Sequence, residues 1–356
     1  MIKRFLHIFL MLLITACGKE QSSSLRNSLI TFAVSAPGLE VTRAEVSEEG
    51  LESSVAGGTV GVRLHETLIN NYIYGLPLIP EQSAEGYTGR WFPESGQDKF
   101  SWTDNTPIGS DKVPAMSFFA FAFSPTSAYG SNILVGDGSR GRSVTITQPS
   151  AYNNADFVDY LLSYITDVPE QTVDGNYPLI SLALEHAVAK VELYVECADV
   201  FWQEASAYRI GFTEVSFNNV KTKAVMTNLD HKRSGEAGTN TWQVSYTGEQ
   251  SKYDLGRYDL DLSDKDRGPV KIMEFLALPI SGTFDYTLSL KYDITDGDGV
   301  STSFEHEPFV LSRFTPNGWK SGHKVRYTLH IDNGISLEGK ILDWVDEDYI
   351  EGVILP

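Results

Sequence analysis

From about residue 29 onward, short runs of alternating apolar and polar residues recur along the chain, bounded by Gly, Pro, Asn, Asp or Ser. A period of two places every second side chain on the same face of an extended strand. In one run, five apolar residues share a face, as expected for a half-buried antiparallel strand: Phe284, Tyr286, Leu288, Leu290 and Tyr292. The same pattern predicts strands at Leu29–Val34, Phe118–Phe123, Ser143–Thr147, Ala187–Cys197, Tyr208–Phe217, Trp242–Tyr246, Val270–Leu278, Phe284–Tyr292, Val325–Ile331 and Ile335–Trp344.

Sustained helical periodicity is scarce, so the chain is predicted to be all-β. The run Asp156–Ile165 fits either a short helix or a strand, because its aromatic and aliphatic residues suit both. The sequence Asp-Gly-Asp-Gly at residues 296–299 lies between two apolar runs and predicts the tip of a hairpin.

The length of 356 residues favours about two domains. A stretch bearing Pro and Gly, Pro169–Pro178, separates a loop-rich first half from a more regular second half. We therefore place the boundary near residue 175, which gives one β-domain over 44–175 and a second over 176–356.

The amino terminus has the pattern of an export signal. Basic Lys3 and Arg4 precede an apolar run, Phe5–Ile14, that is too short to span a bilayer. The residues Leu13 to Cys17 resemble the lipobox of bacterial lipoproteins. The resemblance implies a signal peptide over 1–16, removed by cleavage, and a diacylglycerol with further acylation on Cys17. Each CH₂ group of an acyl chain that is buried in the bilayer contributes about 0.8 kcal/mol, so the lipid would hold the protein firmly in the membrane.

Charge limits the partners of the chain. With 47 acidic and 28 basic side chains the net charge is −19, which repels phosphate and argues against a nucleic-acid partner. Two cysteines are too few for a disulfide framework or a thiolate zinc site. With Cys17 lipidated, Cys197 is expected to be a small buried hydrophobe.

No arrangement of side chains indicates catalysis. The chain has neither the Gly-x-Ser-x-Gly motif of hydrolases nor a phosphate-binding loop. His186 lies in an apolar stretch, so we favour a core histidine hydrogen-bonded to backbone over a ligand or a base. Carboxylate pairs are plentiful in so acidic a chain, so any one pair is weak evidence for hydrolase chemistry. An acidic-site hydrolase is therefore only the third hypothesis. We predict no enzyme activity, no catalytic or metal-binding residues and no cofactor.

Several segments occur in an order that resembles one known family. They are Ile30–Val34 followed by Thr42-Arg43-Ala44, then Tyr160–Tyr164, then Leu184–Glu192, and finally Trp319–Leu329 before Ile341–Trp344. Together with the lipobox, they are similar to the fimbrillin-like proteins of Bacteroidia, which are subunits of lipoprotein-derived type V pili.

The resemblance implies a fold and a processing route. The fold is two transthyretin-like antiparallel β-sandwich domains in tandem. The route is export to the outer membrane, display on the cell surface through the lipid on Cys17, and cleavage after an arginine by an extracellular protease. Arg43 before Ala44 is the best candidate, in a polar loop that a protease can reach, while Arg26 and Arg63 are alternatives. Residues 17–43 are then a lipidated tether and a removable first strand.

The resemblance also implies assembly with other pilus subunits by strand exchange. In the first strand, Ile30, Phe32 and Val34 share one face, and removing it exposes a groove that a neighbour's strand can refill. The terminal segment Tyr349–Pro356 is the best donor: Val353 and Leu355 share a face, and Ile350 lies beyond a glycine. If that segment packs within its own fold, the chain is a tip or cap subunit.

The leading hypothesis is thus a structural or accessory subunit of a cell-surface fimbrium. The hypothesis includes a tip or adhesin subunit, whose ligand would lie on a host or bacterial surface. The alternative is a lipid-anchored surface glycan-binding protein, in which exposed aromatic side chains stack on sugars. The aromatic residues considered for that role are Trp91, Phe92, Trp102 and Trp242.

Overall fold

The structure is a computed structural model, and it describes residues 32–35, 63–66, 76–83, 86–93, 116–124, 133–135, 143–168, 180–199, 201, 208–230, 232–233, 241–261, 268–332 and 334–344. Strands make up most of these ranges, and their helical residues include the short turns η2 (Asn154–Asp156) and η3 (Leu311–Arg313). The prediction of an all-β chain is confirmed.

The chain divides into two compact units, each of which gathers separated stretches of sequence. The first unit comprises residues 1–122, 163–184 and 230–240, and the second comprises 123–162, 185–229 and 241–356. The predicted boundary near residue 175 and the tandem arrangement of the two domains stay predictions.

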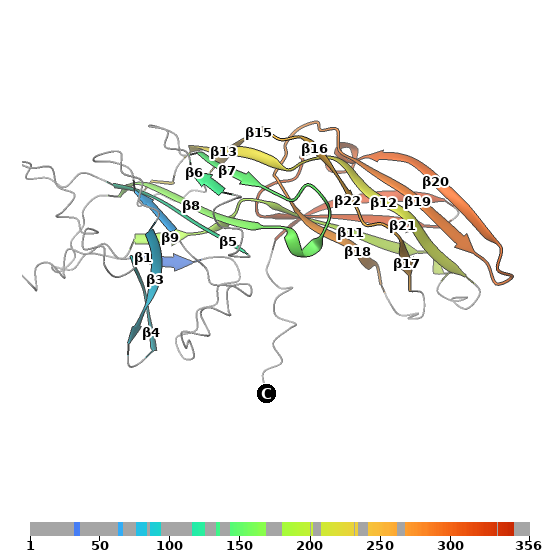
Figure 1. The fold of residues 1–356 in the computed structure, drawn as a ribbon, viewed down its shortest axis with the longest axis horizontal. Coiled ribbons are helices and arrows are strands. Elements are labelled where there is room, and N and C mark those ends of the chain that lie inside the picture. The colour runs from blue at the N-terminus through green and yellow to red at the C-terminus, as the bar shows by residue number, and fades with distance from the viewer. Residues whose placement is uncertain are drawn as a thin grey trace, which may run out of the picture. The chain divides into compact units, whose positions relative to one another are not determined.

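A nine-stranded sheet contains the first described strands, in the order β10-β8-β5-β2-β3-β4-β1-β9, with β14 beside β8. Its strands are β1 (Phe32–Ser35), β2 (Arg63–Glu66), β3 (Leu76–Ser83), β4 (Gly86–Pro93), β5 (Met116–Ser124), β8 (Asp159–Val168), β9 (Ile180–Ala183), β10 (Glu185–His186) and β14 (Lys232–Arg233). Figure 1 labels β1, β3, β4, β5, β8 and β9 among them. The start of β8, up to Leu162, and all of β10 belong to the second unit.

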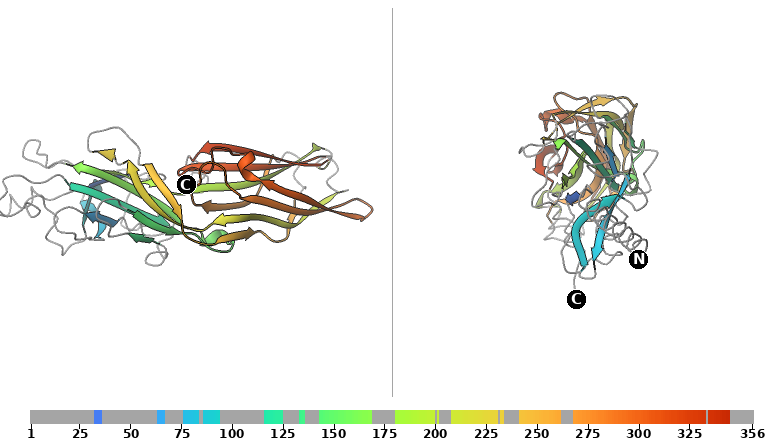
Figure 2. Two further views of the ribbon diagram at one scale, coloured as in Figure 1. Left: turned by 90° about the horizontal axis from the view of Figure 1, so that it is seen from above. Right: turned by 90° about the vertical axis from the view of Figure 1, so that its left-hand side faces the viewer.

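The second unit contains two sheets around a common core, seen from a second direction in the left view of Figure 2. One sheet has the order β18 (Val270–Ala277), β11 (Ala189–Cys197), β21 (His323–Ile331) and β22 (Ile335–Asp343). The other has the order β16 (Gln250–Asp254), β12 (Arg209–Lys221), β19 (Thr287–Thr295) and β20 (Ser301–Val310), with β17 (Tyr258–Leu260) also paired to β12. A further sheet has the order β15 (Thr241–Tyr246), β13 (Lys223–Asp230), β7 (Ser143–Thr147) and β6 (Ile133–Val135).

Alternation along the strands builds the core between the first two of these sheets. In β21, every second residue from Val325 to Ile331 is at most 1% exposed, while Arg326, Thr328 and His330 are half-buried. The predicted apolar face from Phe284 to Tyr292 is also buried, although β19 itself begins only at Thr287. The core closes on Trp319, which is fully buried among aromatic rings.

Local predictions in this region had mixed outcomes. The hairpin tip at residues 296–299 is confirmed, because β19 and β20 pair antiparallel on either side of it. The ambiguous run Asp156–Ile165 is a strand from Asp159 onward, preceded by the turn η2. Three pairings among the described strands, β1 with β9, β11 with β21 and β14 with β8, are parallel rather than antiparallel.

Candidate functional site

The first strand that the structure describes, β1, lies inside a sheet rather than at its rim. It pairs antiparallel with β4 through Phe32 and Trp91, and parallel with β9 along its whole length, from Phe32 opposite Ile180 to Ser35 opposite Ala183. Both of its edges therefore have neighbouring strands. Taking β1 away would leave β4 and β9 with facing, unpaired backbone groups, which is the arrangement that a replacement strand can fill.

Apolar burial adds to this pairing. Phe32 is completely buried, and Ile180 and Leu182 on the adjacent strand β9 are buried as well. The β-branched and aromatic residues of this segment favour an extended strand, and a buried phenylalanine ties it to the interior of the sheet. The site is thus a slot in the sheet with one aromatic anchor.

The predicted site residues fall partly within the described chain. Phe32 and Val34 lie in β1, and Val34 pairs with Leu182. The residues that lie outside the described ranges are Cys17, Ile30, Arg43, Ala44, Ile350, Val353 and Leu355. Of the aromatic residues considered for sugar stacking, Trp91 and Phe92 belong to β4, Trp242 belongs to β15, and Trp102 lies outside the described ranges.

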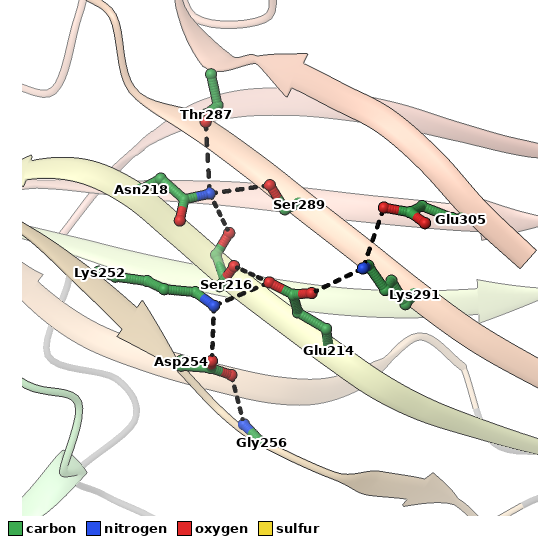
Figure 3. Close-up of polar contacts among 10 residues, drawn as sticks. All are labelled: Glu214, Ser216, Asn218, Lys252, Asp254, Gly256, Thr287, Ser289, Lys291 and Glu305. Atoms are coloured by element: carbon green, nitrogen blue, oxygen red, sulfur yellow. Dashed lines mark hydrogen bonds and ion pairs between the residues drawn. The ribbon is translucent and has the colours of Figure 1, made fainter.

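A second group of polar side chains covers part of the sheet made by β16, β12, β19 and β20 (Figure 3). Lys252 Nζ lies 2.9 Å from a carboxylate oxygen of Glu214 and 2.9 Å from one of Asp254. Lys291 Nζ lies 3.7 Å from Glu214 and 3.1 Å from Glu305, so Glu214 stands between two ammonium groups. Sequence reasoning missed this network because its members come from strands far apart in the chain.

The electrostatics of this network favour charged side chains at neutral pH. The hydrogen bond from Lys252 lowers the pKa of Glu214, and Ser216 and Lys291 act in the same direction against the effect of burial. Hydrogen bonds to Glu214 and Asp254 raise the pKa of Lys252. Both shifts move away from neutrality, whereas a general acid or base works best with a pKa near the operating pH. These groups hold strands together and are not poised for proton transfer.

A pH-dependent contribution to stability follows for Glu214. A glutamate in the unfolded chain has a pKa of about 4.3, and the folded value is lower, so the contribution is complete above that value and is lost as the pH falls through the folded pKa. We expect Glu214→Gln to lower the free energy of unfolding at pH 7 by up to about 1 kcal/mol, as is typical of partly exposed ion pairs. The difference should shrink as the pH is lowered from 7 to about 3, as measured by urea unfolding at both pH values.

Glu307→Gln is the matched control, since this glutamate is exposed on β20 of the same sheet. It should change stability little at either pH. An equal deficit of Glu214→Gln at pH 7 and at pH 3 would show that the ion pairs do not account for the effect.

His186, on the short strand β10, is part of a separate group of side chains. It is buried, as predicted, and its Nδ1 lies 3.0 Å from Asp159 Oδ1. Its ring also stacks on Trp344, with centroids 3.7 Å apart. The pairing of β10 with β8 at Leu161 brings the carboxylate of nearby Asp159 alongside the imidazole.

Two further observations concern burial and the membrane. Cys197 is buried in the core, as predicted, and burial raises the pKa of its thiol to about 12. Within the part of the chain that the structure describes, no helix has the length and apolar character needed to cross a bilayer.

The chain matches one family of sequences and is similar to several solved structures. The sequence model of the fimbrillin-like family matches residues 93–344. No curated protein matches the chain. A crystal structure of a fimbrial protein from Bacteroides vulgatus is similar in fold, with a TM-score of 0.52 and 15% identity over 88% of this chain and 99% of that one. A putative cell adhesion protein from Bacteroides uniformis aligns with a TM-score of 0.45 and 14% identity over 88% of this chain and 98% of that one.

Proposed function

This chain belongs to the fimbrillin-like family, and we propose that it is a subunit of a cell-surface pilus whose copies are joined by exchanged β-strands. The proposal includes both shaft and tip positions, the latter with an adhesive role toward a host or bacterial surface. Its partners are other pilus subunits.

The observation that carries the proposal is the place of β1. A strand that is paired on both edges and anchored by a fully buried phenylalanine leaves an acceptor slot when it is removed. Refilling that slot restores the backbone pairing and buries apolar surface at about 25 cal/mol per Å². A peripheral strand without buried side chains would leave nothing for a neighbour to fill.

The donor in this proposal is the segment Tyr349–Pro356, with Val353 and Leu355 on the face that enters the slot and Ile350 beyond Gly352. It carries no basic residue and ends in a short apolar run. Because the donated segment and the acceptor slot are different parts of the chain, the contact is head-to-tail, and a head-to-tail contact that does not close on itself makes a filament.

Cleavage between Arg43 and Ala44 is the proposed trigger, since it cuts the connection between β1 and the strands that follow. Arg63, one of the alternatives, lies in β2 with strand partners on both sides, at Pro77 and Phe121. Proteases need an extended, accessible segment, so a residue inside a sheet is a poor substrate. This argument favours Arg43 over Arg63.

The trigger can be tested with purified Cys17→Ala protein, which lacks the lipid. Brief treatment with an arginine-specific protease should remove residues up to Arg43 and yield filaments that electron microscopy can detect. Arg43→Ala should resist this cleavage and stay monomeric, while Arg26→Ala, changed on the amino-terminal side of β1, should behave like the parent. A correctly trimmed chain that remains monomeric at high concentration would count against strand exchange.

The lipid anchor is a separate proposal: acyl chains on Cys17 hold the precursor in the outer membrane. Cys17→Ala in the producing cell should move the protein from the membrane fraction to the soluble fraction, because the anchor rests on several buried acyl chains. Immunoblotting of the two fractions measures the effect, and Cys197→Ala serves as the matched control. Undiminished membrane association of Cys17→Ala would remove the anchor from the proposal.

A further inference from the structure

The end of β22 is held by a stacked pair of rings. The indole of Trp344 lies parallel to the imidazole of His186, with centroids 3.7 Å apart and planes inclined by 6°. Trp344 is half-buried and is the last residue of the carboxyl-terminal region that the structure describes. The stack therefore stands at the point where residues 345–356 begin.

The imidazole in this stack is itself fixed in place. His186 is 8% exposed, and its Nδ1 lies 3.0 Å from Asp159 Oδ1 and 2.9 Å from Oδ2. The backbone around it is tied to β8, since His186 pairs with Leu161 and the amide of Ala187 donates to Tyr160 O at 2.7 Å. A carboxylate and a strand pairing thus orient the ring on which Trp344 lies.

A backbone bridge through Gly322 supports the same point. The amide of Gly322 donates to Val188 O at 3.0 Å, and its carbonyl accepts from the amide of Trp344 at 3.3 Å. Its φ of +68° lies in the left-handed region, which glycine adopts without strain. The last residue of the described chain is thereby connected, through one glycine, to the segment that follows His186.

We propose that Asp159, His186 and Trp344 form an exit anchor, which fixes the carboxyl end of β22 at Trp344, the point from which the chain continues into residues 345–356. The inference rests on the proposed function in one respect: those residues include the proposed donor strand. A donor that starts from a fixed point loses less freedom when it docks in a neighbour than one that starts from a frayed strand. Asp159 and His186 are in this sense positioning residues for the exchanged strand.

The anchor can be measured on the uncut, full-length chain by hydrogen exchange at the amides of residues 341–344. Aromatic pairs stabilise by about 1 kcal/mol, so His186→Ala should speed this exchange about fivefold. His186→Phe keeps a ring for Trp344 to stack on, so exchange at 341–344 should stay within about twofold of the parent. His330→Ala is the control: it removes a histidine from β21 that pairs with Glu196 and Glu338 and is not in the stack.

Trp344→Ala gives a second test at a half-buried position, and it should speed exchange at residues 341–343 to the same degree as His186→Ala. The anchor is overturned if hydrogen exchange in His186→Ala and Trp344→Ala matches that of the parent. It is also overturned if His330→Ala speeds hydrogen exchange as much as these two variants do.

Filament growth after trimming separates this inference from the proposed function. If the trimmed parent forms no filaments, the proposal of strand exchange fails. The hydrogen-exchange rates at residues 341–344 still decide whether the anchor exists. If the parent forms filaments, His186→Ala should require a higher protein concentration to do so. Identical growth of the two proteins at every concentration would overturn the positioning role.

Discussion

Replacing Trp319 with alanine should destabilise the second unit more than any change on its surface, by about 3–5 kcal/mol. The side chain is completely buried and meets Phe275, Phe284 and Tyr286 in edge-on contacts. Its Nε1 also donates to the hydroxyl of Tyr327 at 2.9 Å. The substitution therefore removes packing and a hydrogen-bond donor together, and urea unfolding followed by circular dichroism measures the loss.

Trp319→Phe separates the two effects, because it keeps an aromatic ring and removes only the donor and part of the volume. Burial raises the pKa of Tyr327 to about 12, and its hydroxyl keeps Thr315 as a partner at 2.8 Å. We expect the phenylalanine variant to lose less than the alanine variant, and Val300→Ala, at a residue 60% exposed, to lose less than about 0.5 kcal/mol. Equal losses for Trp319→Ala and Val300→Ala would mean that Trp319 is not part of the core.

Period-two alternation was a good guide to which faces are buried. In β21 and β19 it identified the core residues directly, because each of these strands has one face in the core and one outside it. It also placed an apolar strand at the start of the described chain, where Phe32 is completely buried.

Alternation did not indicate which strands pair or in which direction. The parallel pairing of β11 with β21 joins residues more than 130 positions apart, such as Lys190 and Lys324, and no local pattern reports such a partner. Gly318 shows a similar limit. Its φ is +75°, and a Cβ atom there would lie 1.9 Å from Ile280 O, yet this need is evident only once Ile280 and Trp319 are seen to pair.

For the strand β1, the sequence predicts the strand itself but not its neighbours. The sequence indicates an apolar strand around Phe32, whereas its two neighbours β4 and β9 come from later parts of the chain. The stack of His186 on Trp344 was not predicted, because the two residues are 158 positions apart, as their numbers show, and each was assessed by its own surroundings. Tertiary contacts of this kind need the fold.

Phe32→Ala should have the largest effect on the proposed exchange, because it weakens the strand that must leave. After cleavage at Arg43, β1 would be held only by backbone pairing and by side chains such as Phe32, which is completely buried. Replacing a buried phenylalanine with alanine costs about 3–5 kcal/mol. Since 1.4 kcal/mol is about tenfold in an equilibrium constant, dissociation of the cut strand should become about 100- to 4,000-fold more favourable.

The amino-terminal fragment can be followed by size-exclusion chromatography and mass spectrometry after trimming of the Cys17→Ala protein. Phe32→Ala should release it far more readily than the parent, and filaments should grow faster if loss of this strand limits assembly. Ala33→Ser is the matched control, because Ala33 is the next residue of β1, is less buried and pairs with Ser181. Should both variants release the fragment like the parent, Phe32 does not hold the strand in place, and the slot beside β4 and β9 is not the acceptor.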